Sequence, residues 1–359
     1  MNSRVFLASL LCALALWPLQ AMAQAAAEVA EKPTSITRKV WQEAVVSVTD
    51  IDRTARFFIE IGGYESKYRG ALSSSEIKAW GLPDSATGEA LLLGPPGENS
   101  IGEGGLVRLV RFDNAGRKEP TRPGSRAWDT GCYFSLMVRM KDMASVYDDA
   151  IAMGWWTETP ITYLEFGESK LNVMVFQGPD GVQVQAYERL APPLPAGIPE
   201  FDRFTRPFNI MQMVRDRDVA FDFFEQVLGF DTFYKGKPYL DKEPTYMPLG
   251  IPKNLTTSVR YRAGIVYPVP GEFGRMEMIE IMDLDGRDHA ERCHAPNLGI
   301  LAVRYPVEAV ALASEWVQQR GASLDVPVQF VDIAPYGELQ LFSVKTPDGA
   351  NVQFYSVAD

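Results

Sequence analysis

The chain has 359 residues, a formal net charge of −11, 46% hydrophobic residues and 23% charged residues. This length predicts two or three domains with an ample core, and the composition is that of a globular protein. No cluster of Lys and Arg offsets the acidic charge. The charge balance therefore argues against nucleic acid and anionic membranes as partners.

The first 23 residues have the pattern of a secretory signal peptide. Arg4 precedes an apolar run over 5–17 that is too short to span a membrane, and Ala21-Met-Ala23 forms a small-x-small cleavage site. An uncleaved anchor is the weaker alternative, and no Cys follows the site as in a lipoprotein. Cleavage would remove one charge and leave a net charge of −12. We expect a periplasmic or secreted protein, not bound to a membrane, that begins with a flexible lead-in over 24–37.

The signal peptide contains Cys12, so the mature chain keeps Cys132 and Cys293. In an oxidising compartment these two residues could form a disulfide that joins the two halves of the chain. Two buried, unpaired thiols are an equally open alternative.

Two stretches of the mature chain, 43–64 and 209–230, match each other without a gap. Each has an apolar run typical of a buried strand, then an Asp that can cap a helix, a Phe-Phe pair, and a Gly that can end the helix. Asp50 corresponds to Asp216. Each stretch is therefore predicted to form a strand, a helix and the start of another strand.

A second strand and helix are predicted in each half, over 134–153 and over 298–320. Each half then ends in a hairpin with a Pro-Asp-Gly turn, at 179–181 and at 347–349. Between the halves, 191–204 begins as a stiff, Pro-rich connector.

The repeated order predicts an α+β protein of four units, each a strand, a helix and three further strands. One unit has a single apolar sheet face that it cannot bury alone, so two units would close a curved sheet around a shared cleft. We expect a first module over 38–190, a linker over 191–204, and a second module over 205–359.

This order resembles the vicinal oxygen chelate superfamily, which includes glyoxalase I, bleomycin-resistance proteins and extradiol dioxygenases. The resemblance covers nearly all of the mature chain and rests on the two matching stretches and the two Pro-Asp-Gly turns. It implies four βαβββ units that form two tandem open-barrel, glyoxalase-like modules. It also implies metal ligands on the first and last strands, usually a His seven residues before the capping Asp and a Glu just after the Pro-Asp-Gly turn.

The residues at those positions do not match a metal site of this superfamily. In the first half, an arginine would repel a metal ion. In the second half, one carboxylate and two amides carry too little charge to hold a divalent ion tightly. The first-half positions hold Glu43, Arg108, Ser135 and Gln185, and the second-half positions hold Asn209, Glu280 and Gln353.

No histidine occupies any of the expected ligand positions. The mature chain has only His289 and His294, which we interpret as surface residues of one loop. We therefore assign no cofactor and no metal ligand. A divalent metal is left open as an alternative that the ligand positions do not support.

Three hypotheses for function remain. The first is an exported protein that lacks the usual metal ligands and binds a small, largely apolar molecule in a module cleft. The second is a lyase or isomerase of the same superfamily with a weak or absent metal. It would use Glu280 or Glu43 as a general base and an amide or Arg108 as electrophilic partner, because burial raises the pKa of a carboxyl group. The third is a structural protein whose own side chains fill its clefts. A homodimer is left open.

The charges favour the cleft of the second half as the functional centre. In the first half, Arg108 can neutralise Glu43 as a salt bridge. In the second half, Glu280 has no matching cation, and an unpaired inward carboxylate needs a hydrogen-bond partner or a ligand. Asn209 and Gln353 would supply hydrogen bonds to it.

The signal peptide gives the first testable prediction. Protein exported by cells that express the full chain is expected to begin at Gln24, because signal peptidase cleaves after a small-x-small site. N-terminal sequencing of the exported protein measures this. Exported protein that still begins at Met1 would contradict the prediction.

Overall fold

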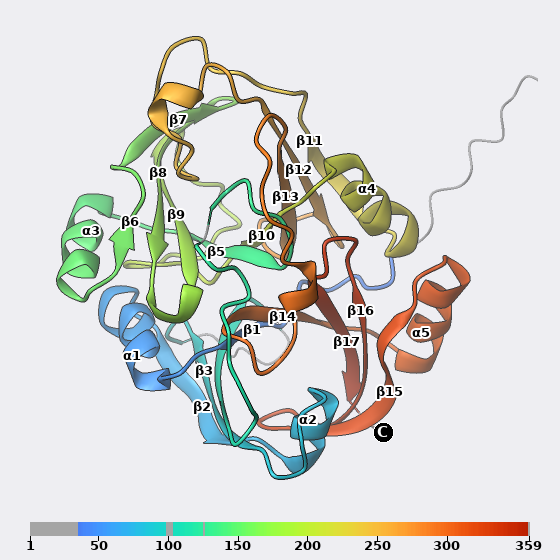
Figure 1. Ribbon diagram of the computed structural model, residues 1–359. Coiled ribbons are helices and arrows are strands. Elements are labelled where there is room, and N and C mark those ends of the chain that lie inside the picture. Colours follow the sequence, from blue (N-terminus) through green and yellow to red (C-terminus); the bar gives the residue numbers. More distant parts are fainter. Residues whose placement is uncertain (1–34, 98–102, 125, 358–359) are drawn as a thin grey trace, which may run out of the picture. The chain divides into compact units, whose positions relative to one another are not determined.

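The computed structural model describes residues 35–97, 103–124 and 126–357 (Figure 1). The predicted signal peptide, 1–23, and most of the lead-in lie outside the described residues. No helix in the described part of the chain is both long enough and apolar enough to cross a membrane.

The four predicted units are all present, in the predicted order (Figure 1). The first unit contains β1 (Glu43–Ser47), α1 (Ile51–Arg56), η2 (Phe57–Ile61), β2 (Glu65–Ala71), α2 (Ser74–Ala79), β3 (Thr87–Gly94) and β4 (Leu106–Asp113). The second contains β5 (Tyr133–Arg139), α3 (Met143–Ala152), β6 (Trp156–Thr157), β7 (Thr162–Phe166), β8 (Ser169–Gln177), η3 (Pro179–Gly181) and β9 (Gln183–Ala191).

The other two units lie in the second half of the chain. The third contains β10 (Asn209–Met213), α4 (Arg217–Asp222), η4 (Phe223–Val227), β11 (Asp231–Lys235), η5 (Lys253–Leu255), β12 (Tyr261–Tyr267) and β13 (Arg275–Ile281). After the short turn η6 (Ala290–Arg292), the fourth contains β14 (Gly299–Pro306), α5 (Val310–Gln319), β15 (Leu324–Ile333), β16 (Gly337–Lys345) and β17 (Asn351–Val357).

The predicted ends of the first helices are confirmed in both matching stretches. The Asp50 carboxylate accepts a hydrogen bond from the Arg53 backbone N–H at 3.0 Å, and Asp216 accepts from Asp218 at 2.8 Å. These bonds satisfy backbone donors that a helix leaves free at its start. At the other end, Gly63 and Gly229 have φ of 75° and 72°, a conformation that glycine adopts at little cost.

The last turn of both helices differs from a regular α-helix. After Arg56 the chain forms the π-turn η2, and after Asp222 it forms the equivalent η4. The rings of Phe57 and Phe58 are fully buried. The Phe57 ring stacks on Trp155, with 3.8 Å between the ring centroids. The wider turn is the same in both stretches, so it belongs to the repeated unit.

The strands form two sheets, and each sheet joins the two halves of the chain. We name as sheet 1 the eight strands β15-β16-β17-β14-β1-β4-β3-β2, and as sheet 2 the nine strands that begin β11-β12-β13-β10-β5-β9-β8-β6, with β7 beside β8. In sheet 1, β1 pairs antiparallel with β14, and in sheet 2, β10 pairs antiparallel with β5. Sheet 1 therefore combines the first and fourth units, and sheet 2 combines the second and third.

This pairing corrects the expected grouping of the units. The α+β class and the four βαβββ units in two open-barrel sheets are confirmed. The predicted modules, 38–190 and 205–359, do not each close their own sheet. β1 and β5 instead pair with strands from the other half of the chain. This pairing satisfies the backbone hydrogen bonds of their edges as well as pairing within one half would.

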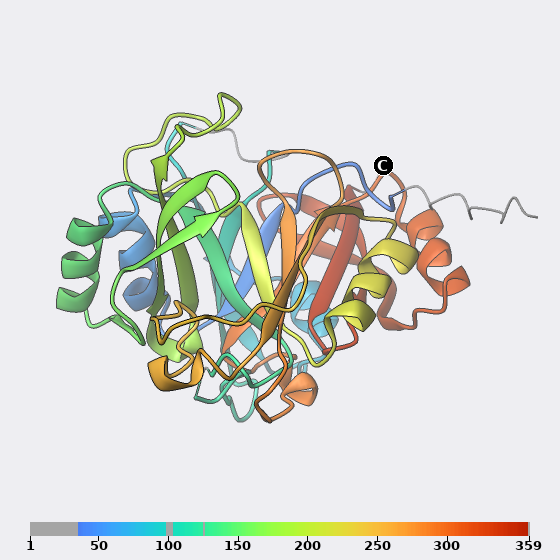
Figure 2. The ribbon, with the colours of Figure 1, turned by 90° about the horizontal axis from the view of Figure 1, so that it is seen from above.

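Within each half, the units meet through their helices. Figure 2 shows α1 beside α3 on one side of the strands and α4 beside α5 on the other. The indole of Trp316 on α5 donates to the carbonyl of Val227 at 2.8 Å. The Pro-Asp-Gly turns add equivalent contacts, because Asp180 accepts from the Thr49 backbone N–H at 2.7 Å and Asp348 accepts from that of Arg215 at 3.0 Å.

One hydrophobic core lies between these helices and the outer faces of both sheets. We call the face of a sheet that packs on α1, α3, α4 or α5 its outer face, and the opposite face its inner face. The outer faces contribute residues of the central strands to the shared core, among them Val46, Val303, Leu136 and Ile210. The inner faces carry separate, smaller apolar clusters that are not part of the shared core.

Cys132 and Cys293 form a disulfide across 161 residues of sequence. Cys132 directly precedes β5 of sheet 2, and Cys293 lies in the segment that leads to β14 of sheet 1. Both cysteines are buried. The alternative left open by the sequence is therefore resolved in favour of a link between the two sheets.

Removing this link is expected to destabilise the protein. A loop of this length restricts the unfolded chain strongly, so the Cys132→Ser/Cys293→Ser variant should lose roughly 5 kcal/mol of unfolding free energy. Denaturant unfolding with and without a thiol reductant measures the loss. Reductant should weaken the wild type but not the variant, and equal stability of the oxidised wild type and the variant would contradict a disulfide.

Candidate functional site

The strand registers define equivalent positions on the two inner faces. In sheet 1, Glu43 lies opposite Arg304, and in sheet 2 Asn209 lies opposite Met137. The last strands contribute glutamines beside these pairs, because Arg304 lies next to Gln353 and Met137 next to Gln185.

The fourth equivalent position of each sheet lies on the strand that pairs in parallel with β1 or β10. Val45 lies next to Arg108 in sheet 1, and Met211 lies next to Glu277 in sheet 2. Since Val45 and Met211 are equivalent in the matching stretches, Glu277 is the counterpart of Arg108. The predicted residues therefore sort by sheet, with Glu43, Arg108 and Gln353 in sheet 1 and Ser135, Gln185 and Asn209 in sheet 2.

The polar residues of sheet 1 form a buried ionic network. Oε1 of Glu43 accepts from Arg108 Nε at 2.8 Å and from Arg304 Nη1 at 2.6 Å, and Oε2 accepts from the Tyr336 hydroxyl at 2.7 Å. Gln353 accepts from Arg304 Nε at 2.7 Å. Burial by itself would raise the pKa of Glu43, but the charges of the two arginines outweigh burial and keep the pKa below its usual range.

The chain itself covers this network. Helix α2 lies over the inner face of sheet 1, where Glu76 forms an ion pair with Arg304 at 3.2 Å and Ile77 joins the apolar cluster. Figure 1 shows α2 beside β15 and apart from the other helices. Glu43 is thus an ionised carboxylate with both oxygens bonded, which does not suit the general base that the second hypothesis required.

Glu280 does not point into a cleft, and the expectation of an unpaired inward carboxylate there is wrong. Its Oε2 accepts from the backbone N–H of Arg217, at the start of α4, at 2.8 Å and from Arg262 Nε at 2.7 Å. It therefore lies on the outer face and has a cation. A shift by an odd number of residues moves a strand side chain to the opposite face, and Glu280 follows the true inward position by three.

Glu277 is the inward carboxylate of sheet 2. It is buried, and its Oε2 accepts from Asn209 Nδ2 at 3.0 Å. Burial raises the pKa of Glu277 to about 7, while the Asn209 hydrogen bond and the charge of Arg275 act in the opposite direction. Asn209 thus hydrogen-bonds a carboxylate as predicted, but the carboxylate is Glu277.

Sheet 2 also carries buried polar atoms that have no hydrogen-bond partner within the described protein. Gln185 donates from Nε2 to the Tyr187 hydroxyl at 2.7 Å, but its Oε1 has no partner. The same is true of Ser135 Oγ, Gln183 Oε1 and Arg139 Nη1. Such atoms are costly to bury without a partner, so their presence together on one face favours a ligand site.

An apolar cluster surrounds these polar groups on the inner face. Part of its cover comes from 236–260, a connection between β11 and β12 that has only the short η5 as regular structure. At Gly250 this connection approaches the Glu158 side chain of the second unit, so it crosses the sheet (Figure 1). Its buried apolar residues in this cluster are Met247, Leu249, Ile251 and Val259. Long connections of this kind are uncommon unless they serve a site.

Neither set of donors fits a divalent metal. In sheet 1, two arginines bind the only carboxylate of the four equivalent positions. In sheet 2 the equivalent positions offer one carboxylate, two amides and the thioether of Met137, too little charge for Zn, Fe or Mn. Across the described residues, no three His, Cys, Asp or Glu side chains gather in a group that could hold a metal ion.

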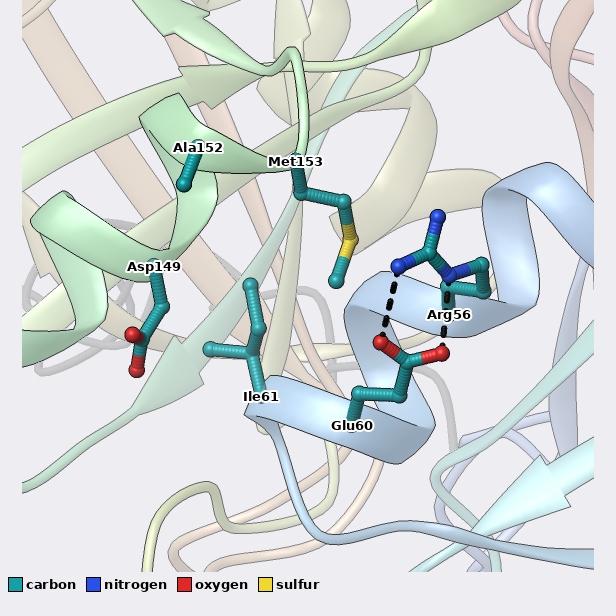
Figure 3. Close-up of a pocket in the computed structure, with 6 residues that line it drawn as sticks. All are labelled: Arg56, Glu60, Ile61, Asp149, Ala152 and Met153. Atoms are coloured by element: carbon teal, nitrogen blue, oxygen red, sulfur yellow. Dashed lines mark hydrogen bonds and ion pairs between the residues drawn. The ribbon is translucent and has the colours of Figure 1, made fainter.

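A surface hollow of about 320 Å³ lies outside both sheets (Figure 3). Arg56 and Glu60 on its wall bind each other at 2.7 Å, and Asp149 faces it from α3. This i,i+4 pair is exposed and typical of a helix surface. Its lining residues come from the first two units and include none of the polar residues of the inner faces. Its complete lining is Arg56, Glu60, Ile61, Asp149, Ala152 and Met153.

Comparisons with known proteins identify the fold. No family model and no curated protein matches the sequence. Among solved structures, glyoxalase I from Zea mays is similar with a TM-score of 0.58 and 15% identity, over 88% of this chain and 92% of that chain. A putative dioxygenase from Bacillus subtilis is similar with a TM-score of 0.53 and 13% identity, over 90% and 87%. The resemblance to the vicinal oxygen chelate superfamily is thus confirmed as a likeness of fold.

The raised pKa of Glu277 predicts a pH-dependent stability. A carboxyl group whose folded pKa is about 7, against an ordinary value of 4.5, destabilises the fold as it ionises between those two values. The wild type should therefore lose up to about 3 kcal/mol relative to Glu277→Gln as pH rises from about 4.5 to above 7. Urea unfolding of both proteins across this range measures the difference.

The control for this experiment is Glu168→Gln, which removes an exposed carboxyl group. A constant stability difference between the wild type and Glu277→Gln across the pH range would show that Glu277 titrates normally.

Proposed function

We propose that the protein binds a small, largely apolar organic molecule on the inner face of sheet 2, without a metal. The observation that carries the proposal is the buried Glu277 carboxyl group, with partnerless polar atoms of Ser135 and Gln185 on the same face. Structural carboxylates are normally matched by cations, as Glu43 is in sheet 1. An inward carboxyl group without such a match is typical of a functional site.

The surroundings of Glu277 set the character of the ligand. The inner face of sheet 2 carries methionine and aromatic side chains, which adapt to apolar ligands. A molecule bound there would replace part of the cover formed by 236–260. The apolar residues of this face include Met137, Met211, Met213, Val175, Phe208 and Ile279.

Sheet 1 serves the proposal as a contrast. Its inner face is covered by α2 and crossed by the network of Glu43, Arg108 and Arg304, as the third hypothesis expected for a cleft filled by its own side chains. We therefore assign stability to sheet 1 and ligand binding to sheet 2.

A lyase or isomerase is the alternative function, and one observation favours it. Glu277 has a pKa of about 7, which suits a general base at neutral pH, whereas Glu43 and Glu280 are held by arginines. In this alternative, Glu277 would accept a proton from the bound molecule. Turnover that is lost in Glu277→Gln, with binding retained, would favour the enzyme over the binding protein.

Export is the second part of the proposal. The signal peptide pattern over 1–23 supports it, and the disulfide between Cys132 and Cys293 is typical of an oxidising compartment. We propose a periplasmic or secreted location with a small molecule as partner.

Native mass spectrometry of protein purified from secreting cells tests the proposal. The wild type is expected to carry an organic adduct, and elemental analysis should show less than one divalent metal per chain. Combining Ser135→Ala with Gln185→Leu should reduce the adduct several-fold, because both side chains lie on the proposed face.

Ser47→Ala is the matched control, since Ser47 is an equally buried serine without a partner for its hydroxyl group, but in sheet 1. It should retain the adduct. Equal adduct in all variants, or one tightly bound metal per chain, would contradict the proposal.

A further inference from the structure

We propose that the molecule bound by sheet 2 is a carboxylic acid in its anionic form, and that Arg139 and Arg189 bind its carboxylate. This inference rests on the proposed binding function and names the chemical class of the ligand. It follows from two buried arginine donors that have no partner and from a surplus of positive charge around them.

The two arginines lie on the inner face of neighbouring strands. Val138 belongs to the shared core, so the next residue of β5, Arg139, lies on the opposite face. Arg139 is next to Tyr187 of β9, which packs against the inner-face cluster. Arg189 follows Tyr187 by two residues on β9 and therefore shares its face.

Arg139 is fixed in place with one donor left over. Its guanidinium lies 4.1 Å from the centroid of Phe208, and its Nη2 donates to the Glu272 carboxylate at 2.7 Å. Its Nη1 is buried and has no partner within the described protein. Because Arg139 is only 7% exposed, a charged donor without a partner is costly there, and a bound anion would remove that cost.

Arg189 offers a second donor beside the first. Its Nε is also buried without a hydrogen-bond partner in the part of the chain that the structure describes. The adjacent Glu188 is used on the outer face, where it accepts from the backbone N–H of Met143 at 3.3 Å. One donor from each arginine matches the two oxygens of a carboxylate.

The arginines repel one another in the absence of such an anion. Arg139 shares the Glu272 carboxylate with Arg275, which approaches it at 3.4 Å. Burial lowers the pKa of Arg139 to about 10; the charge of Glu272 opposes this shift, and the charges of Arg275 and Arg189 add to it. A negative charge placed beside Arg139 and Arg189 would relieve this repulsion.

The surplus amounts to one positive charge. The three arginines face the carboxylate of Glu272 and, when it is ionised, that of Glu277. A fourth arginine, Arg206, forms an ion pair with Glu103 at 3.8 Å and adds no net charge. A single carboxylate would therefore neutralise the site, whereas a phosphate monoester, with a charge of about −2, would exceed the surplus.

Glu277 lies away from the proposed carboxylate position. It is next to Met211, which pairs with Ser135 of β5. Arg139 follows Ser135 by four residues, which is roughly 13 Å along a strand. Met137 lies between these two positions and belongs to the inner-face cluster. The apolar body of the ligand would contact Met137 and separate its carboxylate from Glu277.

Methionine NMR with three probes of equal chain length tests the inference. The mature protein is labelled with ¹³C at the methionine methyl groups and titrated at neutral pH with hexanoate, hexanamide and hexylamine. Met137 reports on the inner face of sheet 2, and Met276 reports on its outer face. Hexanoate is expected to bind most tightly, to shift the signal of Met137 and to leave that of Met276 unchanged.

The variants remove the proposed charge without breaking an ion pair of the described residues. Arg189→Gln should bind hexanoate about tenfold more weakly, because a charge-assisted hydrogen bond is lost. Arg189→Lys keeps the charge and should lose less affinity. Arg111→Gln is the matched control, since it removes another half-buried arginine from a strand, β4 of sheet 1, and it should bind hexanoate as the wild type does.

The other outcomes separate this inference from the proposed function. Tighter binding of hexanamide or hexylamine, reported by Met137, would overturn the inference and leave the proposed function standing. Equal affinity of the wild type and Arg189→Gln for hexanoate would also overturn it. If none of the three probes shifts the signal of Met137, both the inference and the proposed function fail.

Discussion

The architecture depends on two strand pairings, β1 with β14 and β10 with β5. Each one joins units from opposite halves of the chain. The first joins two groups of four strands into sheet 1, and the second joins a group of four and a group of five into sheet 2. The helices then bring the units of the same half together, so the chain is cross-connected by sheets in one direction and by helices in the other. The Cys132–Cys293 disulfide joins the two sheets covalently.

Because of this cross-connection, the two inner faces combine residues from distant parts of the sequence, and they differ in chemistry. Sheet 1 brings together Glu43 and Arg304, 261 residues apart, in a buried network. Sheet 2 brings together Asn209 and Glu277 among partnerless polar atoms. A buried ion network is stable only when its charges are matched, so the sheet with matched charges is structural. The unmatched carboxyl group of Glu277 is the observation that supports the ligand site proposed for sheet 2.

The inward carboxylate of sheet 2 is not the residue that the sequence indicated. The salt bridge between Glu43 and Arg108 agrees with the expectation from the sequence. Glu280, expected to have no cation, binds Arg262, and Asn209 hydrogen-bonds Glu277 instead. The carboxylate itself was placed three residues too late, at Glu280. The connection between the paired strands is longer in the third unit than in the first, so counting along the chain could not identify the register that places Glu277 beside Met211.

The sequence by itself determined the local elements: the capping Asp50 and Asp216, the helix ends at Gly63 and Gly229, and the four repeated units. These depend on interactions within a few residues, which sequence patterns record directly. Only the tertiary structure decided which units share a sheet, whether the two cysteines pair, and which face each side chain of β13 takes. Strand edges pair equally well with either neighbour, and one residue of register reverses a face, so packing of the whole chain makes these choices.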